Sequence, residues 1–362
     1  MRLFVYLFVL IFSCFSAQAF EKPCWLCYGE IDYLYWQANM GDIAIASAPM
    51  TTLNFSSTDP SVLKYIESKS DLTDPGAIDH YSSGVRAAIG FRSICNPWNF
   101  KLRGTYFQTN NEVSSAPDLI FSETQLQYLI PNLNVPFMGN GASSAVGSWK
   151  VDFLTVDLLA SRSFSFCNMA CFNPFFGLRG AWIRQKLKAD YFGVFFTTPG
   201  NTLLEPHTGS IENSKYLAIG FISGFDFSVP LYRRLNLIGS MSGSLLYGHV
   251  NANDIIQGFH AETNPNPPPD FILGAFAGNF STKKTTVRAN FETELGLAYR
   301  FLSQWELYAT YELSLWWDQN DFIDFIFSAP VLDIDSQPNP VLQNKHSNLQ
   351  LSGLVVGLKY FF

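Results

Sequence analysis

Residues 349–362 read LQLSGLVVGLKYFF and alternate large apolar side chains with small or charged ones. One row of this stretch contains Leu354, Val356, Leu358, Tyr360 and Phe362, and the other contains Gly353, Val355, Gly357, Lys359 and Phe361. Successive side chains of a β-strand point to opposite faces, so one row would meet lipid and the other an interior. The stretch therefore predicts a membrane-spanning β-strand.

This strand ends on an aromatic residue, Phe362, two positions after Tyr360. A final strand of this kind resembles the signal that the bacterial barrel-assembly machinery reads. We therefore expect Tyr360 and Phe362 to act as an assembly signal, with that machinery as a partner and outer-membrane lipid as the surroundings.

Residues 1–19 are predicted to be a secretory signal peptide. Arg2 gives a positive start, residues 3–15 form an apolar run, and Ala17-Gln18-Ala19 matches a cleavage site. After this leader, no run of about 18 apolar residues marks a transmembrane helix. We expect residues 20–362 to form one outer-membrane β-barrel domain.

The composition favours a membrane barrel. Charged residues make up 15% of the sequence, below the roughly 25% of typical soluble proteins, and aromatic residues reach 16%. The lipid-facing rows and the interfacial girdles of such barrels are both rich in aromatic residues. The net charge of −7, without a basic stripe, argues against nucleic acid as a partner, and no cofactor is indicated.

Ten segments show the period of two that is typical of strands. In the clearest, residues 286–301, Val287, Leu295 and Leu297 alternate with charged or small residues. Residues 175–188 alternate roughly, and residues 149–160 lose phase near Thr155, where a bulge would restore it. The ten segments are residues 28–38, 85–92, 98–109, 149–160, 175–188, 215–229, 234–248, 286–301, 305–317 and 349–362.

The connections between these segments alternate strictly in length. The long ones are residues 39–83, 110–148, 189–214, 249–284 and 318–348, and the shorter ones are residues 93–97, 161–174, 230–233 and 302–304. Outer-membrane barrels have short periplasmic turns and long extracellular loops. The sequence thus predicts an all-β fold: a transmembrane antiparallel up-and-down β-barrel of ten strands, or up to twelve if residues 39–83 or 110–148 contain further strands.

Several segments resemble the Legionella-type, pore-forming major outer membrane protein family, which has related proteins in environmental chlamydiae. They are KYLAIGFISGFDFSVPLYRRLNLIGSMSGSLLYGHV at residues 215–250, Val156-Asp157-Leu158, Phe176-Gly177-Leu178-Arg179-Gly180 and Asp32-Tyr33-Leu34-Tyr35-Trp36. The resemblance implies a porin-like barrel in the outer membrane, cross-linked through cysteines in the envelope. It transfers no catalytic residues.

Five cysteines follow the predicted leader: Cys24, Cys27, Cys95, Cys167 and Cys171. An exported protein meets an oxidising compartment, so disulfides are expected, with Cys24–Cys27 and Cys167–Cys171 as candidate pairs. The odd cysteine would allow a disulfide to another envelope protein. Free thiols are the alternative, and nothing near Cys24 and Cys27 supports a metal site.

Charged residues are predicted on the inner face of four strands. Basic residues occupy the second and third strands and acidic residues the eighth and ninth, on opposite sides of a ten-strand barrel. The predicted pore-lining residues are Arg86, Arg92, Lys101, Arg103, Arg288, Glu292, Glu294, Glu306 and Glu312. Either they set a transverse field in a water-filled pore, or they pair and close a narrow interior.

The sequence thus favours a porin that passes small polar solutes and contributes to envelope structure, and it allows homo-oligomers. The alternatives are an occluded structural or adhesive barrel and an outer-membrane hydrolase. No motif ties the histidines to a nucleophile, so we expect no enzyme activity. The histidines are His80, His207, His249, His260 and His346. His80 and His249 would face the mouth of the interior, with Asp79 and Asp254 nearby in the sequence.

Overall fold

The computed structural model describes the residues that form the strands and several of their connections. Within this part of the chain, no helix is long and apolar enough to cross a membrane. The described residues are 25–41, 43, 46–48, 54–55, 63–64, 71–73, 75–76, 80–93, 97–115, 130–131, 144–166, 170–198, 201–262, 272–326, 341–344 and 347–362. The predicted signal peptide lies outside them.

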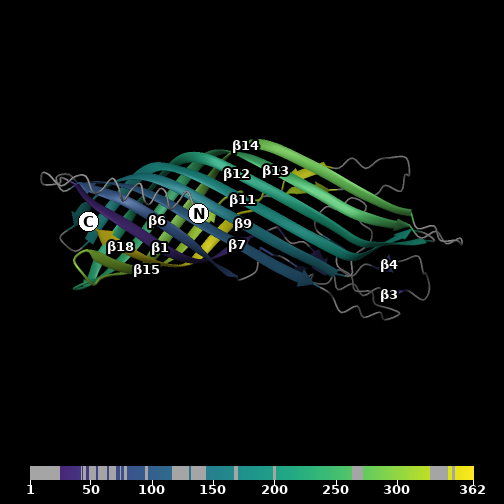
Figure 1. Cartoon of the computed structure of the whole chain (residues 1–362), viewed down its shortest axis with the longest axis horizontal. Coiled ribbons are helices and arrows are strands. Elements are labelled where there is room, and N and C mark those ends of the chain that lie inside the picture. The colour runs from purple at the N-terminus through teal and green to yellow at the C-terminus, as the bar shows by residue number, and fades with distance from the viewer. Residues whose placement is uncertain are drawn as a thin grey trace.

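Ten antiparallel strands form a closed barrel in chain order (Figure 1). They are β1 Trp25–Met40, β6 Tyr81–Ser93, β7 Trp98–Ser115, β9 Ser144–Arg162, β11 Ala170–Thr198, β12 Asn201–Tyr232, β13 Leu235–Glu262, β14 Ile272–Arg300, β15 Trp305–Trp316 and β18 Leu349–Phe361. A further short strand, β10 Phe164–Phe166, pairs with β11. The predicted all-β fold and count of ten barrel strands are confirmed.

The barrel closes where β18 pairs with β1, from Tyr28 opposite Phe361 to Met40 opposite Leu349. Closure leaves neither strand with a free edge. The backbone N–H and C=O groups of such an edge would find no hydrogen-bond partners in lipid. Gly353 lies on this seam at a positive φ of 158°, and a Cβ there would stand 2.1 Å from the carbonyl oxygen of Tyr35. Only glycine therefore fits the close approach of the two backbones at this point.

Short strands also occur in the predicted long loops, but they form small separate sheets. β2 Ala46–Ala48, β5 Asp71–Thr73 and β8 Ile130–Pro131 form one sheet, β3 Asn54–Phe55 and β4 Leu63–Lys64 a second, and β16 Ile323–Ile326 and β17 Val341–Asn344 a third. They therefore do not raise the strand count of the barrel to twelve.

Two of the predicted loops are instead extensions of barrel strands. Most of residues 189–214 and 249–284 continue the hairpins β11–β12 and β13–β14, which project beyond the other strands (Figure 1). The prediction was wrong because it followed lipid-facing apolar alternation, which stops at the membrane surface. Backbone pairing between neighbouring strands continues into water without it.

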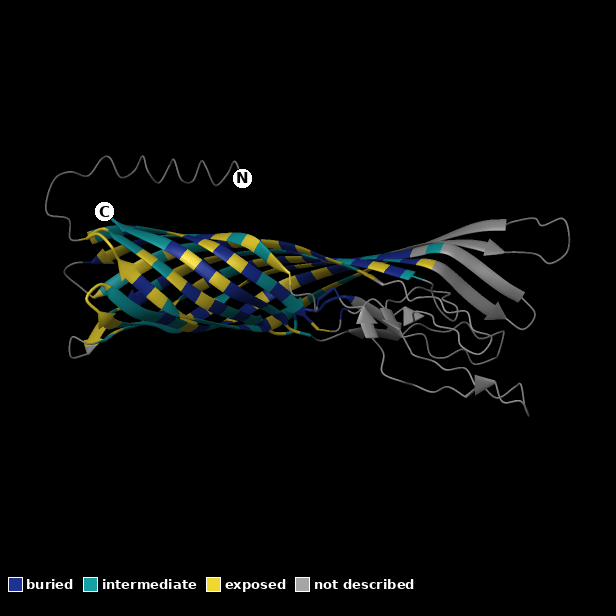
Figure 2. Ribbon diagram, turned by 90° about the horizontal axis from the view of Figure 1, so that it is seen from below, coloured by how far each residue is buried: buried dark blue, intermediate teal, exposed yellow. Residues whose placement is uncertain are grey.

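Burial alternates along much of the described length of the barrel strands, giving the chequered surface in Figure 2. Large apolar side chains such as Ile31, Phe221, Leu245 and Val287 are more than half exposed on the outside. In an outer-membrane barrel this outer row faces lipid. The inner row is buried, so the predicted inward and outward phases of these strands are confirmed.

The predicted bulge near Thr155 is wrong. The register of β9 runs without interruption, with Thr155 opposite Thr105 on one side and Ala181 on the other. The apolar alternation in the sequence changes phase because the apolar row passes from the outer face to the inner face along the strand. Below Thr155 the outer row is apolar, at Val156 and Leu158, whereas above it the inner row is apolar, at Phe153 and Val151.

The last residues are fixed at the barrel end that carries the short turns. The backbone N–H of Phe362 donates to the carbonyl oxygen of Cys27 at 2.9 Å. The ring centroid of Tyr360 lies 4.5 Å from that of Trp305 and 4.8 Å from that of Phe362. The terminal aromatic residues thus lie on the β1–β18–β15 seam.

Deleting Phe362 should reduce assembly in the outer membrane several-fold, because the predicted recognition signal and a contact of the closing seam are both lost. The measurement is the heat-modifiable, folded fraction in isolated outer membranes. Phe362→Tyr, which keeps a terminal aromatic ring, is the matched control and should assemble normally. A deletion variant that assembles as well as the wild type would contradict the role of this residue.

Candidate functional site

The centre of the barrel interior is occupied by a buried ion network around Arg179. Its guanidinium lies 2.7 Å from Asp157 on β9 and 2.7 Å from Glu292 on β14, across the interior. It also donates to the side-chain oxygen of Asn290 at 2.6 Å. Arg103 on β7 joins the network, 2.6 Å from Asp157 and 3.7 Å from Glu292. The neighbouring strands β7, β9 and β11 thus meet β14, from across the interior, in one cluster.

A second buried pair connects β6 with β15. Arg86 lies 2.7 Å from Glu312, donates to both oxygens of that carboxylate, and is 4.0 Å from Asp32. The hydroxyl of Tyr308 donates to Asp32. Arg86 and Glu312 are almost completely buried, so their charges compensate one another away from water.

A third group lies nearer the short turns, where Glu30 on β1 is held between two lysines. Lys101 lies 2.5 Å from its carboxylate and Lys359 lies 2.7 Å from it. The ammonium of Lys359 also stands 4.2 Å above the ring of Tyr28. These contacts again join strands across the closing seam.

The predicted basic and acidic residues therefore meet rather than face each other across water. Arg86, Lys101, Arg103, Glu292 and Glu312 all belong to ion pairs, and Glu294 accepts a hydrogen bond from Thr310 at 2.5 Å. Three predicted residues lie elsewhere. Glu306 pairs with Arg300 at 3.1 Å, Arg92 is exposed near a short turn, and Arg288 lies higher in the barrel.

Several partners in the network were not predicted as pore-lining: Glu30, Asp32, Asp157, Arg179 and Lys359. Asp157 and Arg179 do fall in the Val156-Asp157-Leu158 and Phe176–Gly180 motifs that carried the family resemblance. The two motifs thus form one ion pair across neighbouring strands, with Arg179 directly opposite Asp157. That pairing was the signal available in the sequence.

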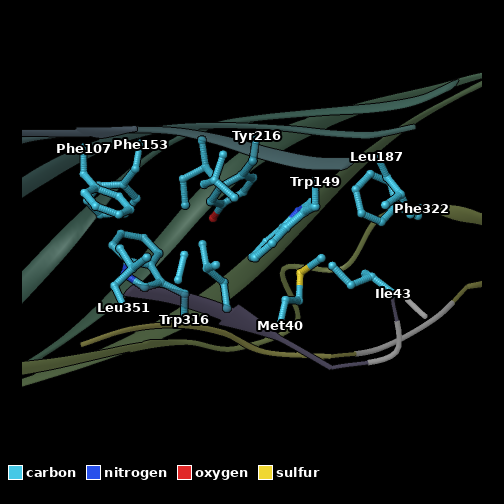
Figure 3. Packing of buried hydrophobic residues seen from close by; sticks show 14 of the residues in the cluster. Met40, Ile43, Phe107, Trp149, Phe153, Leu187, Tyr216, Trp316, Phe322 and Leu351 are labelled. Atoms are coloured by element: carbon cyan, nitrogen blue, oxygen red, sulfur yellow. The ribbon is translucent and has the colours of Figure 1, made fainter. Parts of the chain in front are cut away.

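Above the ion network the interior is filled by apolar side chains from the barrel wall (Figure 3). Trp149, Trp316 and Phe107 have no exposed surface, and the ring of Phe153 meets that of Trp316 edge-on at 5.3 Å. These side chains, with Trp36, Ile183, Leu187, Tyr216, Leu351 and Val355, form what we call the apolar layer. It spans the barrel between the ion network and the extended hairpins.

The segment after β15 turns into the barrel and covers the apolar layer. Gln319 and Asn320 are fully buried, and Phe322 joins the apolar cluster. Asp321 binds the guanidinium of Arg288 and lies 3.2 Å from Lys284. The predicted lumen charge of Arg288 is thus compensated by a connecting segment and not by the acidic strands.

Two of the five cysteines lie within the described residues, and Cys27 and Cys171 form no disulfide with each other. The others, Cys24, Cys95 and Cys167, lie outside those residues, so the proposed pairs stay predictions. No group of three or more His, Cys, Asp or Glu in the described part of the chain is arranged to hold a metal ion.

The histidine prediction is wrong for His249, which lies on the exposed outer face of β13, whereas Asp254 is buried on the inner face and bonded to Ser210. Positions an odd number of residues apart face opposite sides of a strand. His80 contacts Ser82 at 3.3 Å, and His207 lies 3.2 Å from Asp190. His346 and the side chain of His260 lie outside the described structure.

A closed ten-strand barrel, apolar outside and charged inside, with short turns at one end, defines a β-barrel protein of the Gram-negative outer membrane. The chain belongs to the family of the Legionella pneumophila major outer membrane protein precursor, which it matches over residues 29–362. The predicted family and location are confirmed.

Solved structures that match the chain include the outer membrane protease OmpT from Escherichia coli, at 8% identity and a TM-score of 0.44, covering 95% of this chain and 99% of that chain. The toluene transporter TodX of Pseudomonas putida gives 10% identity and a TM-score of 0.25, covering 94% and 90%. A FadL homologue of Pseudomonas aeruginosa gives 9% identity and a TM-score of 0.24, covering 93% of this chain and 90% of that chain. No curated protein sequence matches the chain.

Proposed function

We propose that the protein is a structural component of the outer membrane whose barrel interior is closed to free diffusion. The observation that carries this proposal is the stacking of two filled layers in the interior. The lower layer is the ion network around Arg179, and the upper one is the apolar layer around Trp149 and Trp316. An apolar constriction excludes ions because it dewets.

Porin-like diffusion of small polar solutes is the second candidate function. The charged lower half of the interior favours it, since ionised side chains would hydrate a path for polar solutes. The closure at the other end also depends partly on a connecting segment, residues 317–322, that the pairing of Asp321 with Arg288 holds in place. Release of that segment would remove part of the closure but leave Trp149 and Trp316 in the wall.

The cysteines at the barrel end with the short turns would link the protein to partners in the envelope. Cys27 is partly exposed and Cys171 is exposed, and both lie towards the end with the short turns, which is periplasmic in outer-membrane barrels. Disulfides to other envelope proteins, or between copies in a homo-oligomer, would link the barrel to its surroundings. Gel migration with and without reductant tests this expectation.

The wild-type protein, refolded and inserted into planar bilayers, should give no stable conductance steps, because the apolar layer leaves no hydrated path. Heat-modifiable migration of the same sample serves as the control for correct folding. Reproducible steps in repeated insertions would overturn the closed barrel and select porin-like diffusion instead.

A further inference from the structure

The outer face of β9, β11 and β12 changes from apolar to charged at one level. Leu154, Trp182 and Leu217 are the last members of the lipid-facing rows on these strands. The next outward positions towards the extended hairpins are Asp152, Arg184 and Lys215. Aromatic and cationic residues commonly mark the edge of the hydrocarbon region. This level therefore corresponds to the headgroups of the outer leaflet.

Four cations gather there and form what we call the basic patch: Lys150, Arg184, Lys186 and Lys215. The strand register sets Lys186 directly opposite Lys150, and Arg184 directly opposite Lys215. Like charges in direct cross-strand pairs destabilise a sheet. Two such pairs on three neighbouring strands therefore carry a cost that a bound anion would remove.

Acidic side chains compensate this charge only in part. Lys150 lies 3.8 Å from Asp152, but in the described structure Arg184, Lys186 and Lys215 form no ion pair. The neighbouring Lys188 differs, since it pairs with Asp190 at 2.5 Å. The patch thus presents three exposed cations that form no ion pair among the described residues, although Asp152 lies directly opposite Arg184 in the register of β9 and β11.

The charge is concentrated on one side of the barrel, where Lys283 on β14 also lies on the outer face at the level of Lys215. At the corresponding level of the closing seam, the outward positions beyond Tyr35 and Leu354 are Gln37, Gln350 and Ser352, which carry no charge. A general preference for cations at the membrane surface would distribute them around the whole barrel. The observed asymmetry indicates a local site.

A hollow of about 350 Å³ lies at the edge of the basic patch on the outside of the barrel. Tyr106, Leu154 and Trp182 line its apolar part, and two cations, Lys150 and Arg184, with one carboxylate, Asp152, line its charged part. The guanidinium of Arg184 stands 4.1 Å from the ring centroid of Trp182. The hollow therefore suits a ligand that has both an acyl chain and an anionic headgroup.

We propose that the basic patch binds the phosphates of a phosphorylated, multiply acylated glycolipid of the lipid A type in the outer leaflet. Arginine and lysine both recognise phosphate oxygens, arginine in a bidentate manner. The acyl chains would lie along Leu154, Trp182 and the apolar row below them. Because the patch is continuous with this lipid-facing surface, a membrane lipid fits it better than a free anion does.

The test uses the refolded full-length barrel in detergent micelles, with purified bisphosphorylated lipid A as the probe. Binding is measured by native mass spectrometry and by the lipid-dependent rise in unfolding temperature. The variant carries Lys150→Gln, Arg184→Gln, Lys186→Gln and Lys215→Gln, and Arg162→Gln is the matched control, an exposed cation at the opposite end of β9. Without lipid, the quadruple variant should unfold at or above the wild-type temperature, because two like-charge pairs are removed.

The quadruple variant should bind lipid A at least about a hundredfold more weakly, because each cation beside anionic lipid contributes roughly a factor of five in affinity. The control should bind like the wild type. Unchanged binding by the quadruple variant would overturn the proposal. So would equal binding of dephosphorylated lipid A or of phosphatidylglycerol, or full displacement of lipid A by millimolar inorganic phosphate, which would indicate a free-anion site. A single Arg184→Gln variant gives an intermediate loss if the larger variant does not fold.

Discussion

Replacing Arg179 by methionine should lower the free energy of unfolding of the barrel by about 3–5 kcal/mol, the usual cost of removing one partner from a buried ion pair. Arg179 is buried and contacts both Asp157 and Glu292, so its loss leaves a carboxylate without a close counter-charge. Arg103 would still neutralise Asp157 at 2.6 Å, but it lies 3.7 Å from Glu292. Urea titration of the refolded protein in lipid vesicles, followed by tryptophan fluorescence, measures the change.

Two comparisons separate the ion network from a general effect of losing an arginine. Arg92→Met removes an exposed arginine from a neighbouring part of the barrel and should change stability by no more than about 0.5 kcal/mol. Adding Glu292→Gln to Arg179→Met should recover much of the loss, because no unpaired carboxylate then remains buried at that position. If Arg179→Met were as stable as Arg92→Met, the network would not hold the four strands together.

The barrel fold could be predicted from the sequence because one physical rule acts on every strand. Lipid requires an apolar outer row, so residues such as Val287, Leu295 and Leu297 repeat with a period of two. The rule no longer applies where a strand leaves the membrane. For that reason, the extensions of β11–β14 were predicted as loops, although their backbones remain paired.

The contents of the interior were harder to predict, because they depend on contacts between residues far apart in the sequence. Arg86 and Glu312 are separated by 226 positions, and only the closed barrel brings them together. The inward phase predicted that both residues face inside, but it did not say whether they pair. Asp321 had no signal at all, since it lies on a connecting segment that folds back onto Arg288.

The apolar layer also contradicts the usual expectation that the inside of an outer-membrane barrel is polar. Trp149 and Leu187 occupy inward positions whose outward neighbours are polar or charged. Within a single strand, the apolar alternation of such a segment changes from one face to the other, as it does in residues 149–160. Along these strands the apolar row moves from the outer to the inner face. Comparison of several strands at one level shows why: the barrel has a lipid-facing apolar belt below and an apolar interior above.

Replacing Trp149, Phe153 and Trp316 together by alanine should convert the silent barrel into an ion-conducting one. The three side chains are almost fully buried and contribute three large rings to the apolar layer, so their removal opens a path that water can enter. Below it, the ion network around Arg179 is polar and would hydrate. Planar-bilayer recording should therefore show stable steps for this variant and none for the wild type.

The matched control for this variant is Trp182→Ala, which removes a tryptophan of the same size from the outer face of β11. It should leave the bilayer silent, because the interior is unchanged. Each large-to-small replacement in the layer should cost about 3–5 kcal/mol of stability, so the folded fraction is established first by heat-modifiable migration. If the folded triple variant stays silent while Arg179→Met conducts, the ion network and not the apolar layer is the barrier to ions. The closure would then depend on paired charges from β9, β11 and β14.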